Sequence, residues 1–436
     1  PRIFISGNEA VALAARDADC RVASAYPGTP STEILEYISA YPNLYSEWSI
    51  NEKVSLEVAI GASLAGSRAL CAMKHVGMNV ASDALMTQTL IGAVGGLVIV
   101  IADDVGLSSS QNEQDSRYWG RFAHLPVLEP SDSQETYDIT RFAFGLSEQY
   151  AVPVIVRLTT RICHVKGLVS LSTPQVKEGY RFNKDASRLV MVPGNAKQRI
   201  PLMLERDKTL ANFSESCSLN IVEQGENRSV GFITSGAAYC HVREAFPDAP
   251  LIKLGLSHPA PIELIREFSE SVDKLVVIEE VEPLLETELK AAGIELFGKD
   301  IIPRIGELTP AIITPAIERL LSKENSISTI GMTDVFPRPP TMCVACPHLG
   351  IYYCLSHVRN TIIAGDIGCY TLGAGHPWNA LDTCISMGAS LSVAQGIDKG
   401  RSEEDANKNV IAVIGDSTFL HMGMQGLLDI TYNKGN

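Results

Sequence analysis

The fold is constrained most by a regular alternation, over residues 1–160, between short runs rich in Val and Ile and longer segments with helical periodicity. The apolar runs are predicted strands and cover residues 21–28, 96–104, 125–130 and 152–158. The periodic segments are predicted helices and cover residues 33–41, 53–70 and 133–150. Such alternation predicts a parallel sheet wrapped by helices, and strands that are apolar throughout predict that both faces are covered.

Two further stretches repeat this style. After a polar connector with one expected helix, at residues 160–225, strands are predicted at 229–236, 249–255 and 274–283 and helices at 239–246 and 260–271. A Pro-rich stretch at 326–340 reads as a boundary. Beyond it we expect a strand at 360–368, a helix at 384–397 and a strand at 409–417. The predicted fold class is therefore α/β, with three doubly wound domains at residues 1–180, 181–330 and 335–436.

Composition excludes some partners. The chain of 436 residues has 36 Lys and Arg against 50 Asp and Glu, a net charge of −14, and shows no basic stripe. We therefore expect no nucleic-acid partner, because such binding needs clustered positive charge to neutralise phosphates. The longest apolar run, at residues 91–102, contains glycines and is too short to span a bilayer. A cytoplasmic protein without a membrane partner is expected.

The segment Gly415-Asp416-Ser417 follows a predicted strand, and ligands of parallel α/β sheets bind beyond the carboxyl ends of strands. A carboxylate there suits Mg²⁺ that bridges to a diphosphate, because Mg²⁺ binds few protein carboxylates together with phosphate oxygens. Asp416 also suits the simpler role of a helix cap, and the sequence leaves both open.

The first predicted domain offers three candidates. Thr29 lies in a tight turn between a strand and a helix, where backbone amides and a hydroxyl favour an anionic or carbonyl ligand. Glu52 begins a helix of small residues, although the helix dipole alone also favours Glu in a first turn. The stretches 73–85 and 107–121 read as polar, glycine-bearing loops, and Arg117 in the second suits either a bidentate clamp on a carboxylate or a surface ion pair.

Cysteines cluster late in the chain, as Cys343-x-x-Cys346 and Cys369. In a large chain of this composition such spacing indicates metal or redox chemistry before disulfides. Iron–sulfur or zinc would need a fourth ligand. Cys354 and Cys384 are poor candidates because both fall in segments with helical core patterning.

Taken together, the segments resemble the thiamine-diphosphate-dependent 2-oxoacid:ferredoxin oxidoreductases, and most of all the alpha subunits that act on indolepyruvate. The resemblance covers the whole chain in order and rests on AYPGTPSTEI, NEKVSLEVAIGASLAG, MKHVGMNVASD, CVACPH, GDIGCYTLG, ISMGAS and GDSTF. Each motif alone is weak, but seven in the same order are specific.

The resemblance implies roles for single residues. Glu52 matches the glutamate that hydrogen-bonds the aminopyrimidine, with Glu57 the less well spaced competitor. Thr29 matches a threonine that contacts the 2-oxoacid substrate. Arg117 lies where an arginine that binds the substrate carboxylate is expected, and His75 is a second polar contact of the substrate.

In the third domain the resemblance places the cofactor along Gly365, Asp366, Gly368, Gly415 and Ser417, and Mg²⁺ on Asp416. The Asn that completes the Mg²⁺ site would follow Asn436, as would a segment with two [4Fe-4S] clusters. Cys343, Cys346 and Cys369 match cluster ligands of other members, but CVACPHL lacks the expected Pro-Gly and basic residue. The three cysteines could therefore ligate an iron–sulfur cluster or form a turn of buried thiols, and the sequence leaves both roles open.

By the same resemblance, the first domain is of the pyrimidine-binding type, the second resembles a transketolase C-terminal domain and the third is of the diphosphate-binding type. The implied reaction is oxidative decarboxylation of an aryl 2-oxoacid to aryl-acyl-CoA and CO₂, with electrons passed to ferredoxin. Implied partners are a smaller beta subunit and a second alpha subunit, with the first and third domains meeting at the site. A non-oxidative decarboxylase or carboligase, or a non-catalytic subunit, is the alternative.

Overall fold

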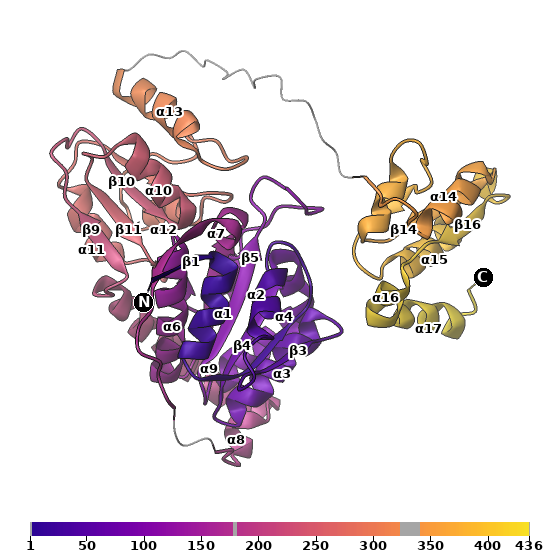
Figure 1. Cartoon of the computed structure of the whole chain (residues 1–436), viewed down its shortest axis with the longest axis horizontal. Coiled ribbons are helices and arrows are strands. Elements are labelled where there is room, and N and C mark those ends of the chain that lie inside the picture. The colour runs from indigo at the N-terminus through magenta and orange to yellow at the C-terminus, as the bar shows by residue number, and fades with distance from the viewer. Residues whose placement is uncertain (1, 178–180, 323–340, 436) are drawn as a thin grey trace. The chain divides into compact units, whose positions relative to one another are not determined.

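The computed structural model describes residues 2–177, 181–322 and 341–435 (Figure 1). The chain divides into two compact units, residues 1–327 and 328–436. Both units contain parallel sheets covered by helices, so the predicted α/β class is confirmed. The division into three domains stays a prediction, and its proposed boundary at residues 326–340 lies outside the described residues.

The main sheet of unit 1 has seven strands, parallel except for one edge strand. In spatial order they are β12 (Leu256–His258), β6 (Val127–Leu128), β7 (Val154–Thr159), β5 (Leu97–Asp103), β4 (Arg68–Lys74), β2 (Cys20–Ala25) and β3 (Tyr45–Trp48). Side chains of β5 alternate between two cores: Val98 and Val100 enter one, Leu97 and Ile99 the other. This is the doubly covered sheet that the Val- and Ile-rich runs predict.

Helices cover both faces of this sheet. One face carries α1 (Gly7–Asp17), α2 (Thr32–Ile38), α6 (Ser133–Tyr150) and α7 (Thr160–His164). The other carries α3 (Glu52–Leu64), α4 (His75–Ile91), α5 (Arg117–Ala123) and α9 (Pro193–Glu215). The short α8 (Ala186–Leu189) precedes α9, and β1 (Arg2–Ser6) pairs with β8 (Lys166–Ser170) in a separate antiparallel ribbon. The connector predicted to hold one helix thus contains the long α9 and four short elements that were not expected, namely α7, β8, α8 and β9 (Asn220–Glu223).

Two sequence predictions in this region are wrong. The helix predicted over 53–70 ends at Leu64, and residues 68–74 form β4, which is buried at every position. Gly66 has a φ of +90°, a conformation that ends the helix and that other residues rarely adopt. Residues 75–91 are not a loop but the 17-residue helix α4, so His75 sits in its first turn.

The second sheet of unit 1 has four strands in the order β13 (Leu275–Ile278), β10 (Gly231–Ser235), β11 (Leu251–Leu254) and β9 (Asn220–Glu223), with only β9 antiparallel. Its faces pack against α10 (Gly236–Ala245) and α13 (Pro310–Ser322) on one side and α11 (Ile262–Ser269) and α12 (Leu284–Ala291) on the other. β12 follows β11 along the chain and pairs with β6, so the second sheet is joined to the first.

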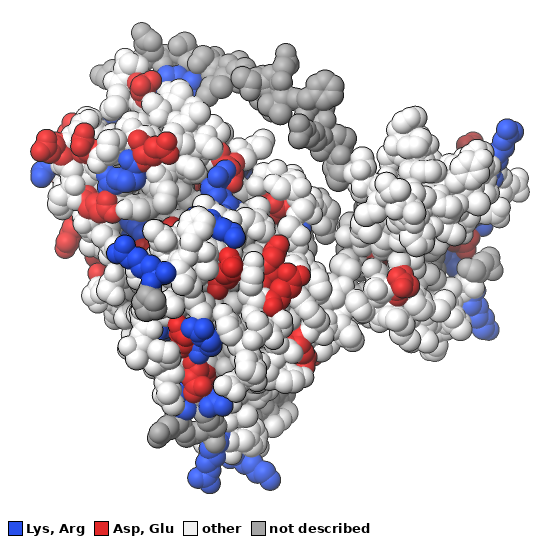
Figure 2. Space-filling model, in the orientation of Figure 1, with Lys and Arg blue, Asp and Glu red and all other residues white. Residues whose placement is uncertain are grey.

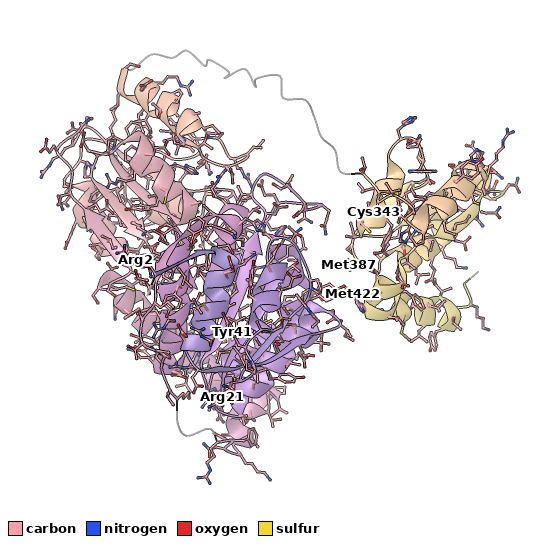
Figure 3. All side chains as sticks on the ribbon, in the orientation of Figure 1. Arg2, Arg21, Tyr41, Cys343, Met387 and Met422 are labelled. Atoms are coloured by element: carbon pink, nitrogen blue, oxygen red, sulfur yellow. The ribbon has the colours of Figure 1, made fainter. Side chains whose placement is uncertain are left out.

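Unit 2 has a three-stranded parallel sheet in the order β15 (Thr383–Cys384), β14 (Thr361–Gly365) and β16 (Asn409–Ala412). Its helices are α14 (His348–His357), α15 (Ser390–Gly400), α16 (Asp416–Thr418) and α17 (Met424–Tyr432). The helix predicted over 384–397 is therefore shorter, and Cys384 lies in a strand. The loop at Met387 packs against the helical turn at Met422, where a Cβ on Gly388 would lie 2.6 Å from the Met422 Cβ (Figure 3).

On the face of unit 1 seen in Figure 2, acidic and basic side chains are interspersed. Among the described residues, none of the helices has both the length and the apolar character needed to cross a bilayer.

Candidate active site

The carboxyl edge of the main sheet gathers the predicted site residues of unit 1. Strands β2, β3, β4 and β5 are parallel neighbours and end at the same edge. The turn at Thr29 follows β2, Glu52 follows β3 and His75 follows β4. Ligands of parallel sheets bind at this edge, so the topology brings the three residues to the expected place.

Glu52 is the first residue of α3 and is only 7% exposed. The preceding Asn51 caps the helix by accepting a hydrogen bond from the amide of Val54. Within the described part of the chain, Oε2 of Glu52 is buried and has no hydrogen-bond partner. A buried polar atom without a partner is costly and calls for an explanation, such as a ligand that supplies the bond.

The Glu52 side chain is held by the first turn of α4. A Cβ built on Gly77 would lie 2.5 Å from Cγ of Glu52 and 2.7 Å from its Oε1, so any larger residue there would displace the Glu52 side chain. Burial raises the pKa of the Glu52 carboxyl above its usual value, which a hydrogen bond from the backbone opposes. A carboxyl of this kind favours the protonated form and donates a hydrogen bond more readily than an exposed one.

Lys74 and His75 lie side by side where β4 meets α4, and both are buried. Nζ of Lys74 donates to the carbonyl of Ser109 at 3.0 Å, and Nε2 of His75 lies 3.0 Å from the carbonyl of Asn112. Burial lowers the pKa of Lys74, and nearby Asp104 opposes this shift. Nδ1 of His75 is a second buried atom without a partner among the described residues.

The sequence reasoning missed Lys74 as a site residue. RALCAMK is otherwise apolar apart from its first residue, but this lysine becomes informative only once residues 68–74 are known to form a fully buried strand.

Thr29 itself is exposed, and the Ser109 hydroxyl lies 3.4 Å from its carbonyl. The loop that contains Ser109 is organised by Asp104, whose carboxylate accepts hydrogen bonds from the amides of Ser108 and Ser109 and from the Ser110 hydroxyl. A Cβ on Gly28 would lie 3.2 Å from Cβ of Lys74. The turn at Thr29, the Lys74 side chain and this loop are therefore neighbours.

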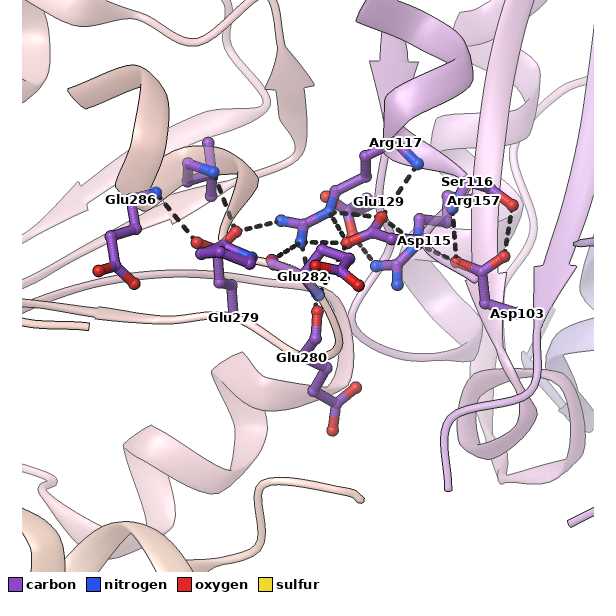
Figure 4. Close-up of polar contacts among 12 residues, drawn as sticks. Asp103, Asp115, Ser116, Arg117, Glu129, Arg157, Glu279, Glu280, Glu282 and Glu286 are labelled. Atoms are coloured by element: carbon purple, nitrogen blue, oxygen red, sulfur yellow. Dashed lines mark hydrogen bonds and ion pairs between the residues drawn. The ribbon is translucent and has the colours of Figure 1, made fainter. Parts of the chain in front are cut away.

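Arg117 lies elsewhere, in a buried ionic network at the junction of the two sheets of unit 1 (Figure 4). Its Nε and Nη2 bind Asp115 at 2.9 and 2.5 Å, and its Nη1 binds Glu279 at 2.6 Å. Nη2 also donates to the carbonyls of Glu280 and Glu282. The guanidinium is completely buried, so the structure does not bring it to the other predicted substrate contacts as an open carboxylate clamp.

A second arginine completes this network. Arg157 binds Asp103 at 2.6 Å and Glu129 at 2.5 Å. Burial opposes ionisation of Asp115, but Coulomb attraction by Arg117 and Arg157 outweighs it and lowers the pKa of Asp115. For Glu279 burial prevails over the attraction of Arg117, and its pKa is raised.

In unit 2, Asp366 follows β14 and is completely buried. One carboxylate oxygen accepts from the amides of Ile367 and Gly388, and the other accepts from the amide of Ser390 at 2.9 Å. Both oxygens thus hold the loop that starts α15. The predicted neighbours differ in exposure, since Gly365 is buried and Gly368 is exposed.

Asp416 and Ser417 are exposed at the start of α16, and Gly415 before them is buried. A Cβ on Gly415 would lie 2.7 Å from the Tyr370 ring, so the backbone needs glycine at this point. Among the described residues, the Asp416 carboxylate makes no hydrogen bond or ion pair. Its oxygens are accessible to a cation, as the Mg²⁺ prediction requires.

The structure does not gather the three predicted cysteine ligands among the described residues, and a cluster on them stays a prediction. In the described part of the chain, no group of three or more His, Cys, Asp or Glu side chains is placed to hold a metal ion. Cys343 and Cys369 are exposed (Figure 3 labels Cys343), and Cys346 lies 3.4 Å from Nδ1 of His348.

Two family models match the chain. Residues 13–214 match the model described as pyruvate flavodoxin/ferredoxin oxidoreductase, thiamine diphosphate binding. Residues 366–436 match the C-terminal thiamine-pyrophosphate-binding domain of thiamine pyrophosphate enzymes. The first match contains Thr29, Glu52, Lys74 and His75, and the second contains Asp416.

Similar proteins include the indolepyruvate oxidoreductase subunits IorA of Thermococcus kodakarensis and Archaeoglobus fulgidus, each 38% identical over all of this chain and 73% of the relative's length. Among solved structures, the 2-oxoglutarate:ferredoxin oxidoreductase of Magnetococcus marinus aligns with a TM-score of 0.61 at 19% identity, over 73% of this chain and 65% of that one. That likeness supports the fold.

Proposed function

The chain belongs to the family of indolepyruvate oxidoreductase alpha subunits, within the thiamine-diphosphate-dependent 2-oxoacid:ferredoxin oxidoreductases, and from that premise we propose a reaction for it. The proposed reaction is oxidative decarboxylation of an aryl 2-oxoacid such as indolepyruvate, with formation of an aryl-acyl-CoA and CO₂. Ferredoxin is the proposed electron acceptor, and a smaller beta subunit the proposed partner.

The observation that carries the proposal is the buried Glu52 carboxyl. Its partnerless Oε2 and raised pKa suit a proton shared with a ring nitrogen, which the aminopyrimidine of thiamine diphosphate presents. When bound, the cofactor supplies the electron sink that accepts the electron pair released as CO₂ leaves. Glu52 holds the proton at Oε2, and Gly77 leaves the room that this carboxyl occupies.

We propose that Lys74, rather than Arg117, provides the cation for the substrate carboxylate. Lys74 lies beside the turn at Gly28 and Thr29, whereas Arg117 is committed to Asp115 and Glu279. The Lys74 ammonium is desolvated, which strengthens its attraction for a carboxylate. Thr29 and His75 remain the proposed polar contacts of the 2-oxoacid.

In unit 2 we propose that Asp416 binds Mg²⁺ and that Gly415 and Ser417 lie against the diphosphate. The exposed, uncommitted carboxylate at the start of α16 supports this assignment. Asp366 is assigned a supporting role instead, because its oxygens are occupied by backbone amides of the Gly388–Ser390 loop.

The test compares Glu52→Gln with Glu57→Gln in the complex with the partner subunit. Glu57 lies on the same helix, is exposed and pairs with Lys53, so it is a matched control. We expect Glu52→Gln to abolish CO₂ release and reduction of a viologen dye with indolepyruvate and coenzyme A, while Glu57→Gln keeps both. Circular dichroism and calorimetric titration with thiamine diphosphate separate loss of chemistry from loss of fold.

Retention of decarboxylation by Glu52→Gln would contradict the proposal. CO₂ release by the unmodified complex without dye reduction would instead indicate a non-oxidative decarboxylase.

A further inference from the structure

A hollow of about 380 Å³ lies in unit 1 between α9 and the C-terminal ends of α4 and α6. Arg188, Arg199 and Arg206 line it, together with Gln149 and Thr209. We call it the arginine cavity. None of its residues belongs to the proposed catalytic set.

The arginine cavity lies far from the carboxyl edge of the main sheet. Helix α4 begins at that edge with His75 and ends 16 residues later at Ile91, where the arginines bind. At about 1.5 Å per residue, the helix separates the two places by roughly 25 Å.

The three guanidiniums bind backbone carbonyls, and Nη2 of Arg206 also donates to the Thr89 hydroxyl. Arg188 donates to Ile91 and Ala93, and Arg199 donates to Leu90 and Ile91. Arg206 donates to the carbonyls of Thr89 and Ala151, and its buried Nε has no partner among the described residues. Nη1 of Arg188 and Nη1 of Arg199 likewise make no hydrogen bond within the described ranges.

Nearby acidic side chains are engaged elsewhere. Asp207 pairs with His124, Glu205 pairs with Lys208, and Asp185 accepts from Ser187 and from the amide of Arg188. Within the described residues, none of the three guanidiniums forms an ion pair with a carboxylate. Desolvation lowers the pKa of Arg188 and of Arg206, and repulsion by neighbouring arginines adds to both shifts, whereas attraction by Asp185 opposes the first shift and attraction by Asp207 the second.

Three positive charges at one hollow are more than a structural role requires. The arginines do fasten α8 and α9 to the end of α4, and its helix dipole attracts cations. That dipole is equivalent to only about half an elementary charge, and Asp185 and Asp207 reduce the positive excess of the three arginines without forming an ion pair with any of them. A multiply charged anion would remove the excess and accept the unused N–H donors, and arginine suits phosphate geometry particularly well.

We propose that the arginine cavity binds a phosphate-bearing small ligand, either inorganic phosphate or the phosphate of a nucleotide. The ligand would accept hydrogen bonds from Arg188, Arg199 and Arg206 and lie remote from the residues proposed for catalysis. This site goes beyond the proposed function.

The test is thermal unfolding and calorimetric titration of the complete chain with inorganic phosphate and with ADP, at constant ionic strength. We expect saturable stabilisation, since a ligand that binds the native state raises its stability by mass action. Arg199→Met and Gln149→Glu are expected to weaken binding by about tenfold or more, because each removes or neutralises a charge-assisted bond. Lys197→Met removes a charge from the same helix outside the cavity and is expected to bind as the unmodified chain does.

Gln149→Glu keeps the proposal testable if Arg199→Met fails to fold. The new carboxylate provides a counter-ion for the arginines, so this variant is expected to have a higher melting temperature without ligand. Tighter binding of ADP identifies a nucleotide ligand, and equal binding identifies free phosphate; both support the site. A saturable response that persists in both variants, or none in the unmodified chain, overturns the proposal. So does loss of the partner subunit from Arg199→Met without any phosphate effect, which would mark a protein contact instead.

Discussion

Replacement of Arg117 by Met tests whether this arginine holds unit 1 together or binds substrate. Met roughly preserves the length of the side chain but removes the charge and all donors. The change would leave Asp115 and Glu279 as buried carboxylates without their nearest cation. It would also leave the carbonyls of Glu280 and Glu282 without this donor.

The magnitude follows from the contacts that remain. Removal of one partner from a buried ion pair costs about 3–5 kcal/mol. Asp115 keeps Arg157 at 3.7 Å, and Glu279 keeps the amides of Leu285 and Glu286 at 3.0 Å each. These contacts limit the loss, so we expect about 3 kcal/mol, the lower end of the range.

The assay is urea unfolding followed by tryptophan fluorescence in a Trp378→Phe background. The remaining tryptophans, Trp48 and Trp119, both lie in unit 1, so the signal reports on that unit. Arg121→Met is the control on the same helix, because Arg121 is half exposed and has one ionic contact, with Glu288 at 3.7 Å. Its expected cost is below about 1 kcal/mol.

Unchanged stability together with a raised KM for the 2-oxoacid would refute this reasoning and restore Arg117 as a substrate clamp. The double variant Arg117→Met/Glu279→Gln gives an independent check. Neutralisation of the stranded carboxylate is expected to recover about 1 kcal/mol, within the range of coupling between contacting residues.

Three further changes test the site and the fold. Gly77→Ala is expected to displace Glu52 and lower kcat far more than the melting temperature, as kinetics and calorimetry would show. Lys74→Met should raise KM for the 2-oxoacid about tenfold or more with a smaller effect on kcat, because one charge-assisted bond is lost. Burial opposes ionisation of Glu148, but Arg68 and Lys177 outweigh it and lower its pKa to about 2, so its contribution to stability is present above pH of about 4.3 and is lost as pH falls toward 2. Glu148→Gln is expected to flatten urea-measured stability over that interval.

The sequence predicts an element of the fold correctly where that element is determined by the apolar spacing of its own residues. Helix α6 was predicted with its observed bounds, Ser133–Tyr150, because its apolar spacing is regular and Asp132 caps it. Strand β4 was missed because RAL continues the small-residue run of α3. What makes residues 68–74 a strand is pairing with β2 and β5, which no local pattern reveals.

For the site, the sequence indicates which residues have suitable chemistry, but it does not reveal their burial or their hydrogen-bond partners. Glu52 was selected by motif, and the structure adds its burial and its partnerless oxygen. Arg117 was selected for its chemistry, yet its charge is used by Glu279, 162 residues away along the chain. Lys74 was overlooked for the same reason, since its neighbours Gly28 and Ser109 come from other strand ends.

Unit 2 shows the same limit with two copies of one local pattern. Gly365-Asp366 and Gly415-Asp416 are the same dipeptide at the carboxyl ends of two parallel strands of one sheet, so the dipeptide itself does not distinguish them. The first carboxylate is completely buried and bound by three backbone amides, whereas the second is exposed. The difference arises because the loop Gly388–Ser390 closes over Asp366, and that loop belongs to another part of the chain. A buried carboxylate satisfied by amides organises its loop, while an exposed one remains available to a cation, so a shared motif here supports two different roles.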